Sequence, residues 1–126
     1  MSFDIFLQRF VDGEAVDADG DSILAILDPL IAGRSGSWAR IVTPDGEADV
    51  YGIDNPRSGL MINHASGRAV WDVLFELAER TGMAVMPAGC RWSVTDAGLI
   101  DGLPAVAPPA AVVTSGGDIL ATLEDP

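Results

Sequence analysis

The chain has 126 residues, and its nineteen carboxylates oppose seven basic residues, all of them arginine, which gives a net charge of −12. This length fits one domain well and two poorly, and the 48% hydrophobic content supplies a core, which argues against global disorder. A field of this sign repels phosphate backbones, so nonspecific nucleic-acid binding is disfavoured.

The single cysteine and the first residues favour a cytoplasmic protein. Cys90 has no second cysteine to pair with, which excludes an intramolecular disulfide. The first ten residues, MSFDIFLQRF, carry an acid at Asp4 and no basic run ahead of an apolar stretch, unlike a signal peptide. No stretch reaches the ~18 uninterrupted apolar residues of a membrane span. We therefore expect a cytoplasmic chain with no membrane partner.

The N-terminal segment alternates apolar residues with a period of two. This alternation predicts a strand over residues 3–11, with Phe6 and Phe10 on one face. Because both faces then carry large apolar side chains, we expect both to be partly covered. The acidic stretch 12–22 is interpreted as a turn region.

A helix is predicted next, because apolar residues recur at helical spacing over 23–31. Pro29 lacks the N–H that a helix interior needs, so it ends or kinks the helix near Asp28. Acidic and hydroxyl residues suit the positive end of the helix dipole. The candidates to cap its start are Asp19, Asp21 and Ser22.

Three short strands follow as a meander. Residues 38–43 and 47–53 are the arms of a hairpin around a Pro-Asp-Gly turn at 44–46. A second turn at 55–59 leads to the third strand, 60–64.

The most regular helix of the sequence is predicted to begin at Ser66 and to end at Gly82, in the usual position for a C-terminal glycine. A short buried strand, 83–86, follows it. One side of this helix is apolar, and carboxylates spaced by four and three residues occupy the other side: Asp72, Glu76 and Glu79.

The last third of the chain is less regular. We predict a short helix over 95–102, a proline-broken connector over 103–109 and a strand over 111–114. Ser115 and Asp118 match a capping box and predict a final short helix.

This order of elements predicts an α+β fold in a single domain over residues 1–126. We expect a largely antiparallel sheet of about five to six strands, with a core of the split βαβ type. The two main helices are expected on one face, and short helices at the C-terminal end.

His64 and Cys90 are the first candidates for chemistry. His64 is the only histidine and ends a predicted strand, where a general base is plausible chemistry. With Cys90 it would make a nucleophile and base pair if the fold brought the two together. The alternative is that Cys90 is a small buried apolar group and His64 hydrogen-bonds to its neighbours.

The acidic loop Asp17, Asp19 and Asp21 resembles the opening of a calcium-binding loop. An EF-hand loop needs glycine at its sixth position and glutamate at its twelfth, and here these are Ser22 and Asp28. A strand also precedes the loop where a helix is required. We favour an acidic helix cap and expect neither a metal nor a cofactor, since no nucleotide-binding, zinc or nucleophile-elbow motif is present.

Carboxylates cluster on two predicted elements. The hairpin carries Asp45, Glu47 and Asp49, and the second helix carries Asp72, Glu76 and Glu79. Such groups are typical of solvated faces, and they also suit the attraction of a basic partner. The tryptophans Trp38, Trp71 and Trp92 are expected in the core or as partly buried anchors.

Four segments carry a family resemblance: SFDIFLQRF at 2–10, GLMINH at 59–64, VWDVL at 70–74 and VMPAGC at 85–90. They resemble segments of small uncharacterised actinobacterial proteins, and proteins of this size and charge resemble immunity proteins of bacterial polymorphic toxin systems. The resemblance covers residues 2–90 best. It implies an inhibitor of a basic toxin and implies no catalytic residue.

Three functions follow as hypotheses. The first is a non-enzymatic protein-binding module, an immunity-type inhibitor that covers a basic partner and is steered by the six clustered carboxylates. The second is a small enzyme or small-molecule binder with a pocket near His64 and Cys90. The third is an oligomeric accessory protein whose interface uses Phe6, Phe10 or Trp92.

Overall fold

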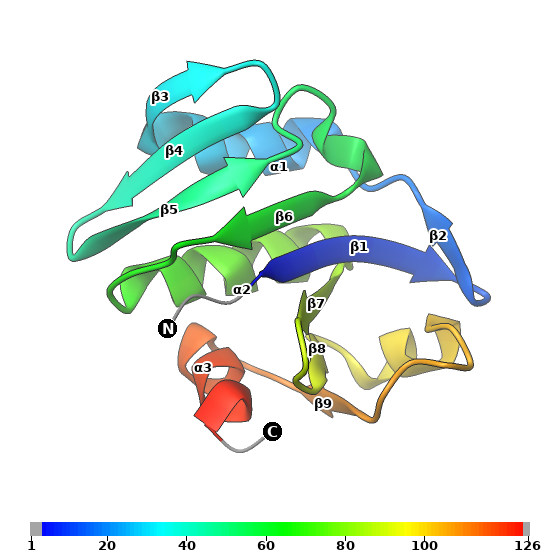
Figure 1. Ribbon diagram of the computed structural model, residues 1–126. Helices are drawn as coiled ribbons and strands as arrows, with labels where there is room; N and C mark the ends of the chain where they lie inside the picture. Colours follow the sequence, from blue (N-terminus) through cyan, green and yellow to red (C-terminus); the bar gives the residue numbers. More distant parts are fainter. Residues whose placement is uncertain (1–3, 125–126) are drawn as a thin grey trace.

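The computed structural model describes residues 4–124, so residue 3 of the predicted strand 3–11 lies outside the described part. Within that part the chain forms nine strands and three α-helices (Figure 1). The strands are β1 (Ile5–Val11), β2 (Glu14–Val16), β3 (Ile31–Ser35), β4 (Trp38–Thr43), β5 (Gly46–Tyr51), β6 (Leu60–Asn63), β7 (Ala84–Pro87), β8 (Trp92–Val94) and β9 (Ala110–Val112). The helices are α1 (Gly20–Leu27), α2 (Ala69–Thr81) and α3 (Gly116–Glu124), with 3₁₀ helices at Asp28–Leu30, Pro56–Ser58 and Ala97–Gly102.

The strands form one open sheet in the order β3-β4-β5-β6-β1-β7-β8-β9, with β2 paired to β1 beside this path. Every neighbouring pair is antiparallel except β8 and β9, which run parallel. The predicted α+β class and the largely antiparallel sheet are therefore confirmed. The expected five to six strands were too few.

Strand β2 corrects the interpretation of residues 12–22 as a turn region. Asp12 and Gly13 both have positive φ, 51° and 82°, which reverses the chain at once in a tight hairpin. Residues 14–16 then pair with the end of β1, Phe10 lying opposite Ala15. An Asp-Gly pair after an alternating strand is a hairpin signal, and the acidic composition of the segment obscured it.

The predicted end of the first helix near Asp28 is confirmed, and strand β3 corrects the assignment of Ile31, the last residue of the apolar pattern over 23–31. Asp19 caps α1 as expected, and α1 stops at Leu27, where Pro29 diverts the chain into a 3₁₀ turn. Ile31 then begins a strand that pairs with β4. An isoleucine fits the apolar pattern of a helix or of a strand, and here pairing with β4 at the edge of the sheet makes it part of a strand.

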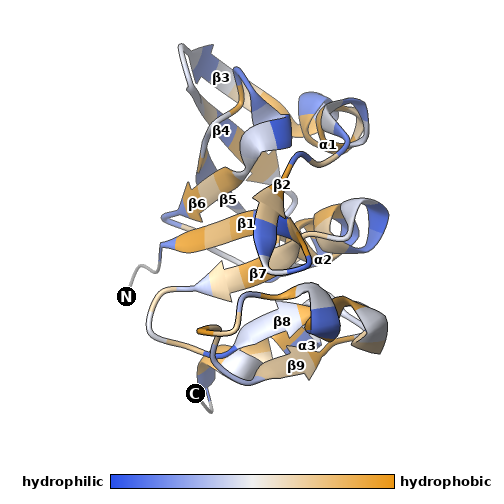
Figure 2. Ribbon diagram, turned by 90° about the vertical axis from the view of Figure 1, so that its right-hand side faces the viewer, coloured by the Kyte–Doolittle hydropathy of each residue, from blue (hydrophilic) through white to orange (hydrophobic). Residues whose placement is uncertain are grey.

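The helices cover one face of the sheet. They bury apolar side chains in the cluster that also contains Ile5 and Leu7 of β1, and α2 contacts both α1 and α3. Figure 2 shows α1 and α2 on one side of the strands, as predicted for the main helices. Trp71 of α2 is buried in this layer, and Trp38 and Trp92 are half-buried on the sheet. No helix in residues 4–124 is both long and apolar enough to cross a membrane.

Candidate functional site

The face of the sheet opposite the helices carries large apolar side chains at its centre. Alternation along β1 directs Ile5 and Leu7 into the core and Phe6 to the other face. Phe6 lies opposite Met61 of β6 and Met86 of β7 in the strand registers. It is 46% exposed, a large fraction for a phenylalanine at the middle of a sheet.

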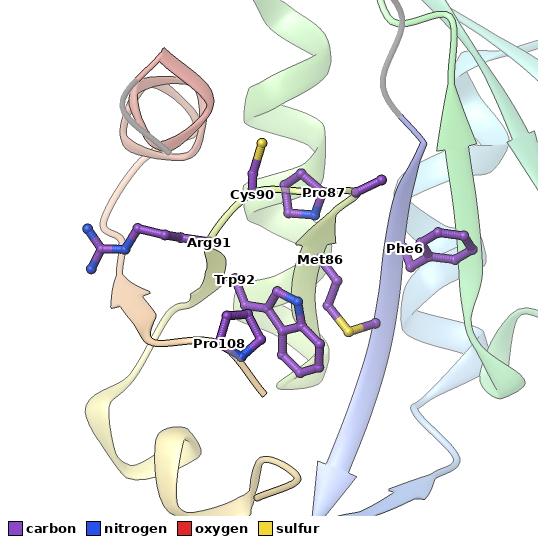
Figure 3. Close-up of a pocket in the computed structure, with 9 residues that line it drawn as sticks. Phe6, Met86, Pro87, Cys90, Arg91, Trp92 and Pro108 are labelled. Carbon is purple, nitrogen blue, oxygen red and sulfur yellow. The ribbon is translucent and has the colours of Figure 1, made fainter. Parts of the chain in front are cut away.

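Two shallow grooves of about 540 Å³ each meet at Phe6 and Met86. One extends over the turn after β7 to Trp92 and Pro108, and Figure 3 shows Met86 between Phe6 and Trp92. The other crosses β6 to Tyr51 and reaches Ala15 of β2. We call the surface lined by these two grooves the sheet-face groove.

Phe10 and Trp92 close the groove on the β8 side. Their rings stack with centroids 5.8 Å apart and planes 14° from parallel. Such a contact between strands far apart in sequence holds β8 against β1. The sequence named Phe6, Phe10 and Trp92 as candidates for apolar surface, and the structure brings all three to one face.

A polar network lies on the same face, over β4 and β5. Asp49 Oδ1 accepts hydrogen bonds from Trp38 Nε1 at 3.1 Å and from Arg40 Nε and Nη2 at 3.2 Å. His64 Nδ1 lies 2.9 Å from Asp49 Oδ2. Burial opposes ionisation of this carboxyl, and the contacts from His64, Trp38 and Arg40 outweigh it and lower the pKa of Asp49.

The loop that carries His64 passes directly over the β4–β5 hairpin. A Cβ on Gly46 would overlap the carbonyl of Ser66, so this crossing needs a glycine in the hairpin. Ser66 donates its backbone N–H to Glu47 O at 2.9 Å. The prediction that the helix begins at Ser66 was therefore wrong, since α2 begins at Ala69. Asp45 caps α2 instead, accepting from the N–H groups of Arg68 at 2.8 Å and Ala69 at 3.2 Å.

The hairpin carboxylates therefore differ in role. Asp45 is committed to capping α2, and these backbone hydrogen bonds, that of Arg68 first, lower its pKa. Glu47 is exposed and lies 3.7 Å from Arg40. Asp49 is 6% exposed and enclosed by its three partners, so it is not available to a partner protein as a solvated charge.

The α2 carboxylates lie as the helical spacing predicted. Asp72, Glu76 and Glu79 are all exposed, and the Asp72 carboxylate lies beside Gly116 at the start of α3. Glu76 is 3.6 Å from Arg80 one turn away. No ion pair within residues 4–124 includes Asp72 or Glu79.

His64 and Cys90 follow different strands and lie in different surroundings. His64 follows β6 and Cys90 follows β7, and β1 lies between these two strands. Neighbouring strands are ~4.8 Å apart, so the two flanking strands are roughly 10 Å apart. The ring of His64 contacts Asp49, whereas Cys90 lines the same groove as Trp92.

In the loop with Asp17, Asp19 and Asp21, Asp19 is the N-cap of α1, as the helix-cap interpretation predicts. Asp19 accepts from Ser22 Oγ at 2.9 Å and from the backbone of Asp21 and Ser22, and the Ser22 hydroxyl leads in lowering its pKa. Asp17 lies 3.9 Å from Arg57. In the described chain no three His, Cys, Asp or Glu side chains are grouped to hold a metal ion.

Sequence reasoning missed Tyr51, Met61 and Met86 as surface residues and Arg40 as a partner of Asp49. The signal was present in the hairpin register. The turn at 44–46 places Arg40 opposite Asp49 and Trp38 opposite Tyr51 on one face. The positions of Met61 and Met86 depend on β1 lying between β6 and β7, which no local pattern shows.

Comparison with known proteins found no match among family models, curated proteins or solved structures.

Proposed function

We propose that this chain is a non-enzymatic protein-binding module that binds a basic protein and covers its active site, as an immunity-type inhibitor does. The observation that carries the proposal is the large surplus of exposed carboxylates that no cation of the chain neutralises. A surface of this sign attracts a basic protein and speeds its encounter.

The ion pairs support this surplus. Within residues 4–124 they join Asp17, Glu47, Asp49 and Glu76 to arginine or histidine. Most of the other carboxylates of the described chain, including Asp72 and Glu79, are exposed to solvent. The field of the net charge of −12 is therefore only locally compensated.

Two further observations support a binding role over catalysis. The ring of His64 contacts the carboxylate of Asp49, whereas Cys90 lines an apolar groove, so each of the two residues has a neighbour that serves a structural or binding role. The grooves on the sheet are shallow and largely apolar, which suits contact with a macromolecule better than enclosure of a small substrate.

The test uses the protein encoded beside this chain's gene as the partner. Association rates are measured by stopped flow at low and physiological salt for the wild type and for a variant with Asp72→Arg and Glu79→Arg. We expect a partner of high isoelectric point whose association slows several-fold in the variant and with added salt.

A charge-conserving variant, with Asp72→Glu and Glu79→Asp, is the control and should associate like the wild type. A neighbouring protein that does not bind, or an association rate that neither salt nor the charge reversals alter, would count against the proposed function.

A further inference from the structure

We propose that the sheet-face groove around Phe6 is the docking surface of this protein, and that its occupant is a cluster of apolar side chains on the basic partner. The inference rests on the proposed function and adds where the partner sits. It places the partner on the side of the sheet away from α1 and α2 (Figure 2).

The first argument is the composition of the groove. Its floor combines aromatic rings and flexible thioethers from five neighbouring strands: Phe6, Tyr51, Met61, Met86 and Trp92. Aromatic residues and methionine are enriched in the centres of protein interfaces, where they supply most of the binding energy. Methionine also adapts its shape to the side chain that packs on it.

The second argument is continuity. Phe6 and Met86 line both grooves, so the apolar surface runs without interruption from Tyr51 on β5 to Trp92 on β8. Neighbouring strands are ~4.8 Å apart, so four strand spacings make a surface about 19 Å wide. This width suits several anchoring side chains of a protein and exceeds what one small ligand would cover.

The third argument is charge, which selects among occupants. A second copy would bring another net charge of −12 against the same face, and an anionic membrane would be repelled likewise. Exposed carboxylates lie at two edges of the apolar surface, and Arg91 is the one basic residue of the described chain that lines either groove. Asp4 precedes β1 and its carbonyl accepts from Ala88 of the groove, and Asp54 lies between Gly52 and Ser58 of the groove. A partner with apolar anchors flanked by basic residues complements this pattern.

The fourth argument separates the groove from the α2 carboxylates. These lie on the helical side of the sheet, so a partner seated on Phe6 does not touch them. They act on it only through the overall field, which governs encounter more than residence. The groove and α2 should therefore affect different rate constants.

The experiment compares five immobilised forms of the full chain: wild type, Phe6→Ser, Met86→Ser, Val106→Ser and the double variant with Asp72→Arg and Glu79→Arg. Val106 is the matched control, because it is 93% exposed and does not line the groove. Each form first captures proteins from an extract of the native cell. Binding kinetics are then measured with the purified captured protein, and thermal melting checks that each variant is folded.

We expect one basic protein to be captured by the wild type and by Val106→Ser. Phe6→Ser and Met86→Ser should each raise its dissociation rate about tenfold or more, since central apolar anchors dominate residence. The Asp72→Arg and Glu79→Arg variant should lower the association rate and leave dissociation near that of the wild type.

Three outcomes would overturn the inference, and they are distinguishable from failure of the proposed function. In the first outcome, a basic partner dissociates from Phe6→Ser and Met86→Ser as slowly as it does from the wild type, which would mean that it binds at another surface. A faster dissociation from the charge-reversed α2 variant would place the docking surface on the helices. Wild-type dimers in light scattering that disappear in Phe6→Ser would make a second copy the occupant. Capture of no basic protein by any form would instead remove the proposed function itself.

Discussion

Asp49 shows what a single carboxylate gains from its neighbours on a sheet. Three donors from β4 and the loop after β6 converge on it, and it is buried although it lies on the uncovered face. Charged hydrogen bonds of this kind stabilise more than neutral ones, and an unpaired donor left behind is costly. Arg40 also lies 5.9 Å from the centre of the Trp38 ring, so these two partners of Asp49 contact each other as well.

Removal of this carboxylate should destabilise the protein. We expect Asp49→Ala to lower the free energy of unfolding by about 1–3 kcal/mol, because Trp38 and Arg40 lose a buried acceptor. Urea denaturation followed by tryptophan fluorescence measures this. Glu47→Ala on the same strand removes only an exposed ion pair with Arg40 and should change stability by less than about 1 kcal/mol. Equal losses for the two variants would contradict the role given to Asp49.

The same residue predicts how stability depends on pH. The pKa of Asp49 is lower in the folded protein than its ordinary value of 3.8, so its ionised form favours the folded state. This contribution is complete above about pH 5 and is lost as the pH falls through the folded pKa. The stability difference between the wild type and Asp49→Ala should therefore be constant near neutral pH and shrink below about pH 4. Melting curves across this range would show it, and a difference that grows on acidification would have the wrong sign.

At the scale of elements, α2 depends on the hairpin for its first turn. Arg68 at the cap position makes no side-chain bond to the helix, and Asp45 supplies the acceptor from 23 residues earlier. We expect Asp45→Ala to lower the melting temperature and to speed hydrogen exchange at the amides of Arg68 and Ala69. Asp54→Ala, an exposed acid of the next loop with no hydrogen bond among the described residues, should leave that exchange unchanged.

The packing of α3 on α2 gives a sharper test, because two adjacent glycines differ in their surroundings. A Cβ on Gly116 would lie 2.5 Å from the backbone of Trp71 and Asp72, whereas on Gly117 its nearest neighbour is Ser115 Oγ at 3.7 Å. Gly116→Ala should therefore destabilise by about 1–3 kcal/mol through overpacking. Gly117→Ala should be neutral or stabilise by up to about 1 kcal/mol, since alanine favours helix. Thermal melting of the two variants compares them, and similar melting temperatures would contradict this close approach.

Sequence patterns predicted the elements whose stabilising contacts are local. The β4–β5 hairpin has its own turn residues, α2 has its apolar stripe and glycine stop, and Ser115 caps α3 by accepting from Asp118 N–H at 3.1 Å. Of the three strands that were not predicted, β2 carries its own Asp-Gly turn, whereas β3 and β8 are short and pair with β4, β7 and β9. The strand state of Ile31 and Trp92 depends on the strands that pair with them, and the residues next to them in the sequence do not show which strands those are.

The candidate site divides in the same way. Exposure of the α2 carboxylates followed from helical spacing. Strand alternation placed Phe6 on the second face of β1, but that face was expected to be partly covered and it leaves Phe6 46% exposed. Enclosure of Asp49 did not follow, because His64 reaches it from a loop fifteen residues away with a φ of 51°, unusual for a residue other than glycine. The two grooves meet at Phe6 and Met86 because β1 lies next to β7 in the sheet, and local sequence patterns do not predict this strand order.

At the scale of the whole molecule, like charges repel within the fold. A net charge of −12 disfavours the compact state, and salt screens this repulsion over a Debye length of ~8 Å at physiological ionic strength. We expect the melting temperature to rise by about 2–5 °C between low and physiological salt. A variant with Asp72→Asn, Glu76→Gln and Glu79→Gln, which changes the net charge from −12 to −9, should show a smaller rise. A melting temperature that falls with salt in both proteins would mean that ion pairs, and not repulsion, dominate.

Cys90 offers a practical consequence of the groove's position. It is the one cysteine of the chain, it is partly exposed, and it lines the same groove as Trp92, next to Pro87 (Figure 3). The chain has no lysine, so amine-directed reagents have only the N-terminus to modify and thiol chemistry has a single target. A maleimide dye on the native protein would thus report occupancy of this surface by a change in fluorescence, with no engineered label.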